Sequence, residues 1–117
     1  MQGRELAEAC RKYAEEKKAE AVVILDVREV SSVTDYFVIA SATSEPHVRA
    51  VWNEVVGRLK QDHGVNVTKP EGTRFDNWVV IDYFDVIVHV MHKDIRDRYD
   101  LEGLWNDAPL IKTQVES

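Results

Sequence analysis

Two short apolar runs in the second half of the chain, Trp78–Ile81 and Val86–Met91, constrain its fold more than any other feature. Each run is long enough for a β-strand but too short for a stable helix. Only the four residues DYFD at positions 82–85 separate them, which is a common length for a hairpin connection. The pattern therefore predicts two antiparallel strands joined by a turn.

The remaining sequence predicts further strands and helices around this hairpin. Apolar residues at helical spacing indicate a helix over Gly3–Lys18 and a second one between an N-cap at Ser44 and a stop at Gly64. Strands are expected at Ala21–Val27, at Tyr36–Ala42 and, as a short third strand, over 65–70, and a short helical segment over 93–107. The order α-β-β-α-β-β-β-α predicts a single α/β domain over 1–109, with a mixed sheet of about five strands and flanking helices, followed by a tail at 110–117.

Composition limits the classes of protein to which the chain can belong. The 117 residues suit one domain. The single cysteine, Cys10, excludes an internal disulfide and lies on the apolar stripe of the first predicted helix, which favours a packing role. The N-terminus carries no apolar signal core, and no apolar stretch approaches the roughly 20 residues that span a bilayer. A cytoplasmic protein, or one in an organelle matrix of similar redox state, is expected.

The charge balance bears on the partner. Fifteen basic residues are scattered among 21 acidic ones, giving a net charge of −6. Nucleic-acid binding demands clustered Lys and Arg, so direct DNA binding is not expected. An acidic domain suits a basic protein partner, such as a ribosomal protein or a histone.

The carboxylates and histidines of the hairpin are candidate ligands for catalysis or metal binding. His89 and His92 are three apart, so in a strand they point to opposite faces, which is poor geometry for a shared metal. The helical zinc-protease spacing and paired CxxC motifs are absent from the sequence. Asp82 and Asp85 flank the predicted turn, where aspartates bond the local backbone, and this turn role is the favoured interpretation.

Three aromatic residues of the hairpin are candidate contact residues. Tyr83 and Phe84 are bulky for a turn that prefers Gly or Asn, and are expected to be exposed at its tip. Trp78 begins the first strand of the hairpin, where it is either a core residue or an interface anchor. The sequence pattern leaves these two roles of Trp78 open.

Three ordered motifs resemble one protein family over nearly the whole chain. SSVTDYFVIASATSEPHV at 31–48 is similar to a family signature of the form S-S-x-T-D-x-x-V-I followed by S-x-x-H-V. Glu71-Gly72 with WVVIDYFDVIVHV at 78–90, and RDRYDLEGLWNDAP at 96–109, match its second and third motifs. The chain resembles the ribosomal silencing factor family, RsfS, also called Iojap.

This resemblance implies a binding function with no catalysed reaction. Members bind ribosomal protein number fourteen of the large subunit and sterically block the joining of the two subunits, which represses translation. The fold is implied to be nucleotidyltransferase-like without catalytic residues, no cofactor is implied, and homodimers are known in the family. Carried over by position, the partner-binding residues are Trp78, Asp82, Tyr83, Asp85 and His89, with Glu71 and Gly72 shaping the adjoining loop.

Two departures and one alternative stay open at this stage. Many members have Gly where this chain has Phe84, and many have Arg in the region of Glu45 and Pro46. The alternative function is a divergent, metal-dependent, nucleotidyltransferase-like enzyme that uses Asp26, Asp35 and Asp82. These carboxylates converge only if their strands are neighbours, which the sequence does not show.

Overall fold

The computed structural model describes residues 3–30, 34–66, 77–99 and 110–111. They form three helices and five strands in the order α-β-β-α-β-β-α-β. The elements are α1 (Gly3–Glu16), β1 (Glu20–Asp26), β2 (Tyr36–Ala42), α2 (Glu45–His63), β3 (Trp78–Asp82), β4 (Val86–His92), α3 (Lys93–Tyr99) and β5 (Leu110–Ile111). The predicted α/β class, the mixed sheet and the two long helices are confirmed.

The sheet is mixed, with the strand order β3-β4-β2-β1-β5. β3 and β4 are antiparallel, as the hairpin pattern predicts, and Val80 lies opposite His89 in their register. β4 pairs in parallel with β2, with Tyr36 opposite Val86, and the connection from β2 to β4 includes α2. β2 is therefore central and buried along its whole length, as a strand covered on both faces should be.

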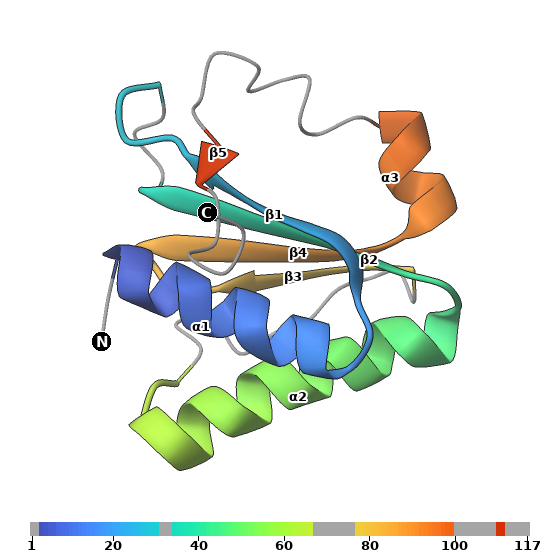
Figure 1. Cartoon of the computed structure of the whole chain (residues 1–117), viewed down its shortest axis with the longest axis horizontal. Helices are drawn as coiled ribbons and strands as arrows, with labels where there is room; N and C mark the ends of the chain where they lie inside the picture. Colours follow the sequence, from blue (N-terminus) through green and yellow to red (C-terminus); the bar gives the residue numbers. More distant parts are fainter. Residues whose placement is uncertain (1–2, 31–33, 67–76, 100–109, 112–117) are drawn as a thin grey trace.

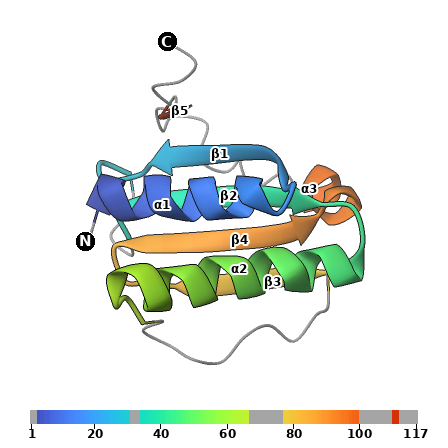
Figure 2. The same cartoon turned by 60° about the horizontal axis from the view of Figure 1, so that its bottom comes forward.

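The two long helices lie on the same face of the sheet (Figure 1). α1 packs over β1 and β2, while α2 packs over β4 and its neighbours (Figure 2). The core between helices and sheet includes Val38, Val55 and Leu59, each with a fully buried side chain. Cys10 also lies in this core, and burial raises the pKa of its thiol, which fits the predicted packing role.

The ends of α2 follow the sequence signals closely. The Ser44 hydroxyl accepts a hydrogen bond from the backbone N–H of His47 at 3.2 Å, and Gly64 takes the left-handed conformation with φ of 68°. The His47 ring links this end of α2 to the end of α1. Its Nδ1 accepts from the Thr43 N–H at 2.9 Å, which leaves Nε2–H to donate to the Lys17 carbonyl at 2.7 Å. The predicted caps are confirmed.

Two predictions about strands differ from the structure. Val65 and Asn66 are not part of a strand, because the Val65 N–H turns back to the Leu59 carbonyl at 3.0 Å and completes the end of α2. The rest of that predicted third strand lies outside the described residues. Leu110 and Ile111, placed in the tail by the sequence, instead form β5 and pair with Leu25 and Ile24 of β1.

Candidate functional site

The second face of the hairpin, away from α1 and α2, carries the candidate site. Side chains alternate along β3, so Val79 and Ile81 enter the helix-covered core while Trp78, Val80 and Asp82 face the other way. The register places Ile87, His89 and Met91 of β4 beside them. We call all of these side chains except Met91 the β3–β4 face: Trp78, Val80, Asp82, Ile87 and His89.

Within the β3–β4 face, Trp78 and His89 form a polar contact on an apolar base. The indole N–H of Trp78 donates to Nδ1 of His89 at 3.2 Å, and the two ring centroids are 6.1 Å apart. Phe37 of β2 meets the same imidazole edge-on at 5.4 Å. Trp78 is half-buried and packs against the cluster that contains Met91. Trp78 therefore packs partly against the core and stays partly exposed, and its role as an interface anchor stays a prediction.

His89 is held in its neutral form. Burial lowers the pKa of its imidazole from 6.5 to about 4, because the site removes water from the charged form. A neutral ring is also what the contact with Trp78 requires, since Nδ1 can accept a hydrogen bond only while it carries no proton. At neutral pH the face therefore presents an uncharged imidazole, with Nε2 as its remaining N–H donor.

The turn between the two strands uses the Asp82 side chain as predicted, whereas Asp85 takes part through its backbone. The Asp82 carboxylate accepts a hydrogen bond from the Phe84 N–H at 2.8 Å, the local contact that favours aspartate before a turn. The Tyr83 N–H bonds to the Val86 carbonyl at 2.9 Å. We call residues 82–85 the hairpin tip.

The two aromatics of the hairpin tip have opposite environments. Phe84 is 72% exposed, as expected, whereas Tyr83 is only 6% exposed and belongs to the helix-side core. The expectation that Tyr83 is exposed is therefore wrong. Tyr83 continues the inward alternation of Val79 and Ile81, and that alternation is the signal that identifies it as a core residue.

The hairpin tip is fixed by a segment 50 residues earlier in the chain. The buried Thr34 donates its hydroxyl to the Phe84 carbonyl at 3.0 Å. The backbone N–H groups of Asp35 and Tyr36 both donate to the Asp85 carbonyl at 3.1 Å. Two of the quoted sequence motifs thus meet at one point, where the first motif supports the turn of the second.

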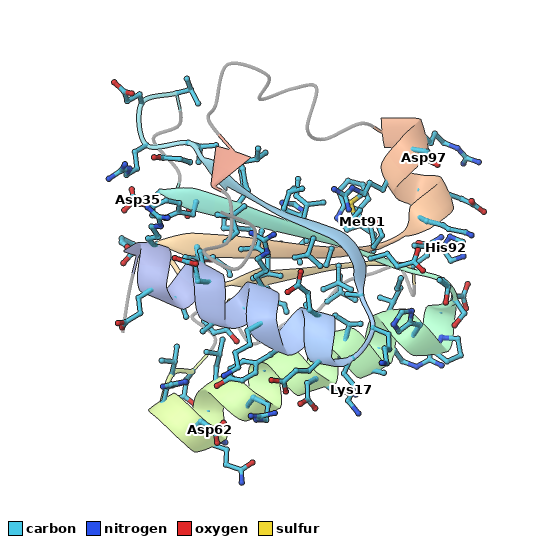
Figure 3. All side chains as sticks on the ribbon, viewed as in Figure 1. Lys17, Asp35, Asp62, Met91, His92 and Asp97 are labelled. Atoms are coloured by element: carbon cyan, nitrogen blue, oxygen red, sulfur yellow. The ribbon has the colours of Figure 1, made fainter. Side chains whose placement is uncertain are left out.

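The three carboxylates of the alternative enzyme lie at the end of the sheet where the hairpin tip is, but two of them already accept hydrogen bonds. Asp26 accepts two hydrogen bonds from the Arg28 guanidinium, at 2.7 and 2.9 Å, and these bonds hold the pKa of Asp26 below its usual range. Asp82 binds the Phe84 N–H. Asp35 is exposed at the same end of the sheet (Figure 3). Within the described part of the chain, no three His, Cys, Asp or Glu side chains gather closely enough to hold a metal ion.

The structure thus brings together only part of the predicted site. Trp78, Asp82 and His89 share the β3–β4 face, Asp85 supports the turn through its backbone, and Tyr83 is buried. Glu71 and Gly72 lie outside the described residues. The sequence reasoning missed Val80, which is 36% exposed, and Ile87, although counting every second residue from Trp78 and from His89 would have found both.

The comparisons with known proteins agree with this architecture. The sequence model of a family described as "Ribosomal silencing factor during starvation" matches residues 1–117. This chain belongs to the ribosomal silencing factor family. The match includes residues 110–117, the predicted tail.

Individual relatives of the ribosomal silencing factor family support the same assignment. The chain is 39% identical over 114 residues to "Ribosomal silencing factor RsfS" of Halalkalibacterium halodurans, and the match covers 97% of each chain. It is 32% identical over 92 residues to the mouse "Mitochondrial assembly of ribosomal large subunit protein 1", covering 77% of this chain and 40% of the mouse protein. A crystal structure of a Chromobacterium violaceum protein superposes with a TM-score of 0.84 at 33% identity, covering 91% of this chain and 88% of that one.

Proposed function

We propose that this protein binds the large ribosomal subunit at ribosomal protein number fourteen and thereby prevents the two subunits from joining. The observation that carries this proposal is the match to the ribosomal silencing factor family over the whole chain. The name of the mouse relative concerns the large ribosomal subunit, which supports the choice of subunit. The cytoplasm is the proposed location, because a single cysteine suits a reducing compartment. Self-association stays a prediction.

The β3–β4 face supplies suitable chemistry for such a contact. Trp is enriched among the residues that dominate binding energy, and here its ring is oriented by His89 before any partner arrives. Val80 adds exposed apolar surface and Asp82 adds negative charge at the rim. The net charge of −6 complements a basic ribosomal protein.

The proposed mechanism is occupancy of a surface, with no chemical step. A typical stable interface buries about 800 Å² on each partner, so the contact would extend beyond the five side chains of the β3–β4 face. A bound domain then fills space that the small subunit needs. Repression follows from the lifetime of the complex, so the residues that matter are those that slow dissociation.

The test is sedimentation of the protein with purified large and small subunits, read on a sucrose gradient. We expect the wild type to travel with the large subunit and to reduce the yield of joined ribosomes. Trp78→Ala should weaken that binding by about 2 kcal/mol or more, the range found for dominant interface residues. The melting temperature of the variant shows whether the domain is still folded.

Trp52→Ala is the matched control for this experiment. Trp52 is another half-buried tryptophan, but it lies on α2 and packs against the helix-side core. We expect Trp52→Ala to lower the melting temperature and leave subunit binding unchanged. If the wild type stays at the top of the gradient at physiological salt, the proposed function is wrong. If both variants bind equally well, the β3–β4 face is not the contact surface.

A further inference from the structure

Phe84 combines two unfavourable properties at the end of the hairpin. Its backbone is left-handed, with φ of 76°, a conformation that glycine adopts freely and that bulky side chains rarely take. Its side chain is 72% exposed, more than that of the other two large hydrophobic residues found exposed among the described residues, Val30 and Val80. An aromatic ring at this position therefore costs backbone free energy and buries little apolar surface in return.

The backbone contacts of Phe84 do not account for its side chain. The Asp82 carboxylate holds the Phe84 N–H, and the Thr34 hydroxyl holds the Phe84 carbonyl. Both contacts involve backbone atoms, so a glycine at position 84 would keep them. The turn needs the left-handed conformation and has no need of the ring. A strained residue that the surrounding structure holds in place is a reason to look for a role outside the fold.

The charges near Phe84 indicate which partner the ring could meet. Asp82 and Asp85 lie in the same tip as Phe84, and the backbone N–H of Asp35 donates to the Asp85 carbonyl, so three acidic residues meet at this tip. Negative charge of this kind disfavours nucleic-acid phosphates. It suits a protein surface in which Lys or Arg side chains border an apolar recess.

We propose that Phe84 is an apolar anchor that enters a recess bordered by basic side chains on the protein that covers the β3–β4 face. This inference rests on the proposed function and adds a second contact region to it. Asp82 belongs both to the β3–β4 face and to the hairpin tip, so the two regions are continuous along the chain. Because the contacts with Asp82 and Thr34 already fix the backbone of Phe84, little backbone freedom is lost on binding.

The test compares two glycine substitutions that relieve the same kind of strain at opposite edges of the molecule. Lys18 also has a left-handed backbone, with φ of 66°, and is exposed. It follows Lys17 at the end of α1, across the molecule from Asp35, which adjoins the hairpin tip (Figure 3). Phe84→Gly and Lys18→Gly should both raise the melting temperature. Only Phe84→Gly should weaken binding to the purified large subunit, by about tenfold or more.

Phe84→Tyr is the conservative variant, because it keeps the ring and the backbone strain. We expect its affinity for the large subunit to stay within about threefold of the wild type, a small change by the standard of dominant interface residues. A higher melting temperature together with weaker binding in Phe84→Gly is a combination that a purely structural role of Phe84 would not produce.

The outcomes separate this inference from the function on which it rests. If Phe84→Gly binds as tightly as the wild type while Trp78→Ala binds weakly, Phe84 is not an anchor but the proposed function stands. If Lys18→Gly weakens binding as much as Phe84→Gly does, relief of strain is responsible and the inference is wrong. If the wild type itself does not bind the large subunit, both the proposed function and the anchor role of Phe84 are wrong.

Discussion

The two faces of the β3–β4 hairpin come from the same two strands but are built from different kinds of side chain. The face toward the helices carries aliphatic residues that are almost completely buried: Val79, Ile81, Val86, Val88 and Val90. The β3–β4 face carries an indole, an imidazole, a carboxylate and two partly exposed aliphatic residues. The first face is what stability requires of a sheet packed on helices, whereas the second packs only in part against the cluster that contains Met91 and leaves Val80 exposed.

The largest expected effect tests this difference between neighbours on one strand. Ile81 is 1% exposed and Val80 is 36% exposed, and they point to opposite faces. Ile81→Ala should lower the free energy of unfolding by about 2–5 kcal/mol, because it leaves a cavity in a packed core. Val80→Ala should change it by about 0.5 kcal/mol or less. Urea denaturation measures both.

Equal losses in the two variants would show that the β3–β4 face is as important for folding as the helix-covered face. Sedimentation with the large subunit measures binding by the same two variants. Val80→Ala should weaken association with the large subunit at constant stability. Ile81→Ala should affect binding only through the fraction of molecules that is folded.

The next effect concerns pH and the buried imidazole of His89. Its pKa is about 4 when folded and 6.5 when unfolded, so between these values the unfolded chain binds more protons and folding stability falls as the pH falls. One proton of difference corresponds to at most about 1.4 kcal/mol per pH unit. We expect denaturant midpoints to decrease from about pH 6.5 toward pH 4 and His89→Gln to reduce that slope.

The carboxylates act in a different pH range. Arg28 and Arg58 lower the pKa values of Asp26 and Asp62 below the usual 3.8, so the stability that these groups contribute is lost at more acidic pH. A His89→Gln profile identical to the wild type between pH 6.5 and 4 would show that His89 is not the group responsible.

The smallest expected effect is at Tyr83 on the helix-covered side. Its hydroxyl is buried and has no hydrogen-bond partner among the described residues, in contrast to the indole N–H of Trp78. Tyr83→Phe removes that group without changing the packing of the ring. We expect the free energy of unfolding to stay the same or rise by up to about 1 kcal/mol, read from the melting temperature. A clear loss of stability would mean that the hydroxyl is bonded.

The sequence predicted those parts of the fold that are specified locally. α2 begins after Ser44 and ends before Gly64 because both caps act within one turn of the chain. The hairpin followed from two apolar runs and a short link. β5 was missed because two residues, Leu110 and Ile111, are too few to show an alternation, and they become a strand only by pairing with β1.

The site was predicted less completely, for a related reason. Which residues share a face depends on where the alternation begins, and the turn aromatics obscured it: Tyr83 continues the inward series, and Phe84 ends it. The partner of Trp78 was also hidden. Its contact with His89 depends on the pairing of Trp78 with Met91 in the β3–β4 register, which places His89 diagonally across from the indole.

The parallel pairing of β2 with β4 has a consequence for synthesis. The centre of the sheet closes only when β4 pairs with β2. Tyr36 then lies opposite Val86, which is 50 residues later in the chain, and contacts of such long sequence separation form slowly in folding. A chain still being translated can therefore form α1, β1, β2 and α2, but it cannot complete its central sheet. If the proposed function holds, a nascent chain that ends before β4 lacks the β3–β4 face and cannot yet bind the large subunit through it.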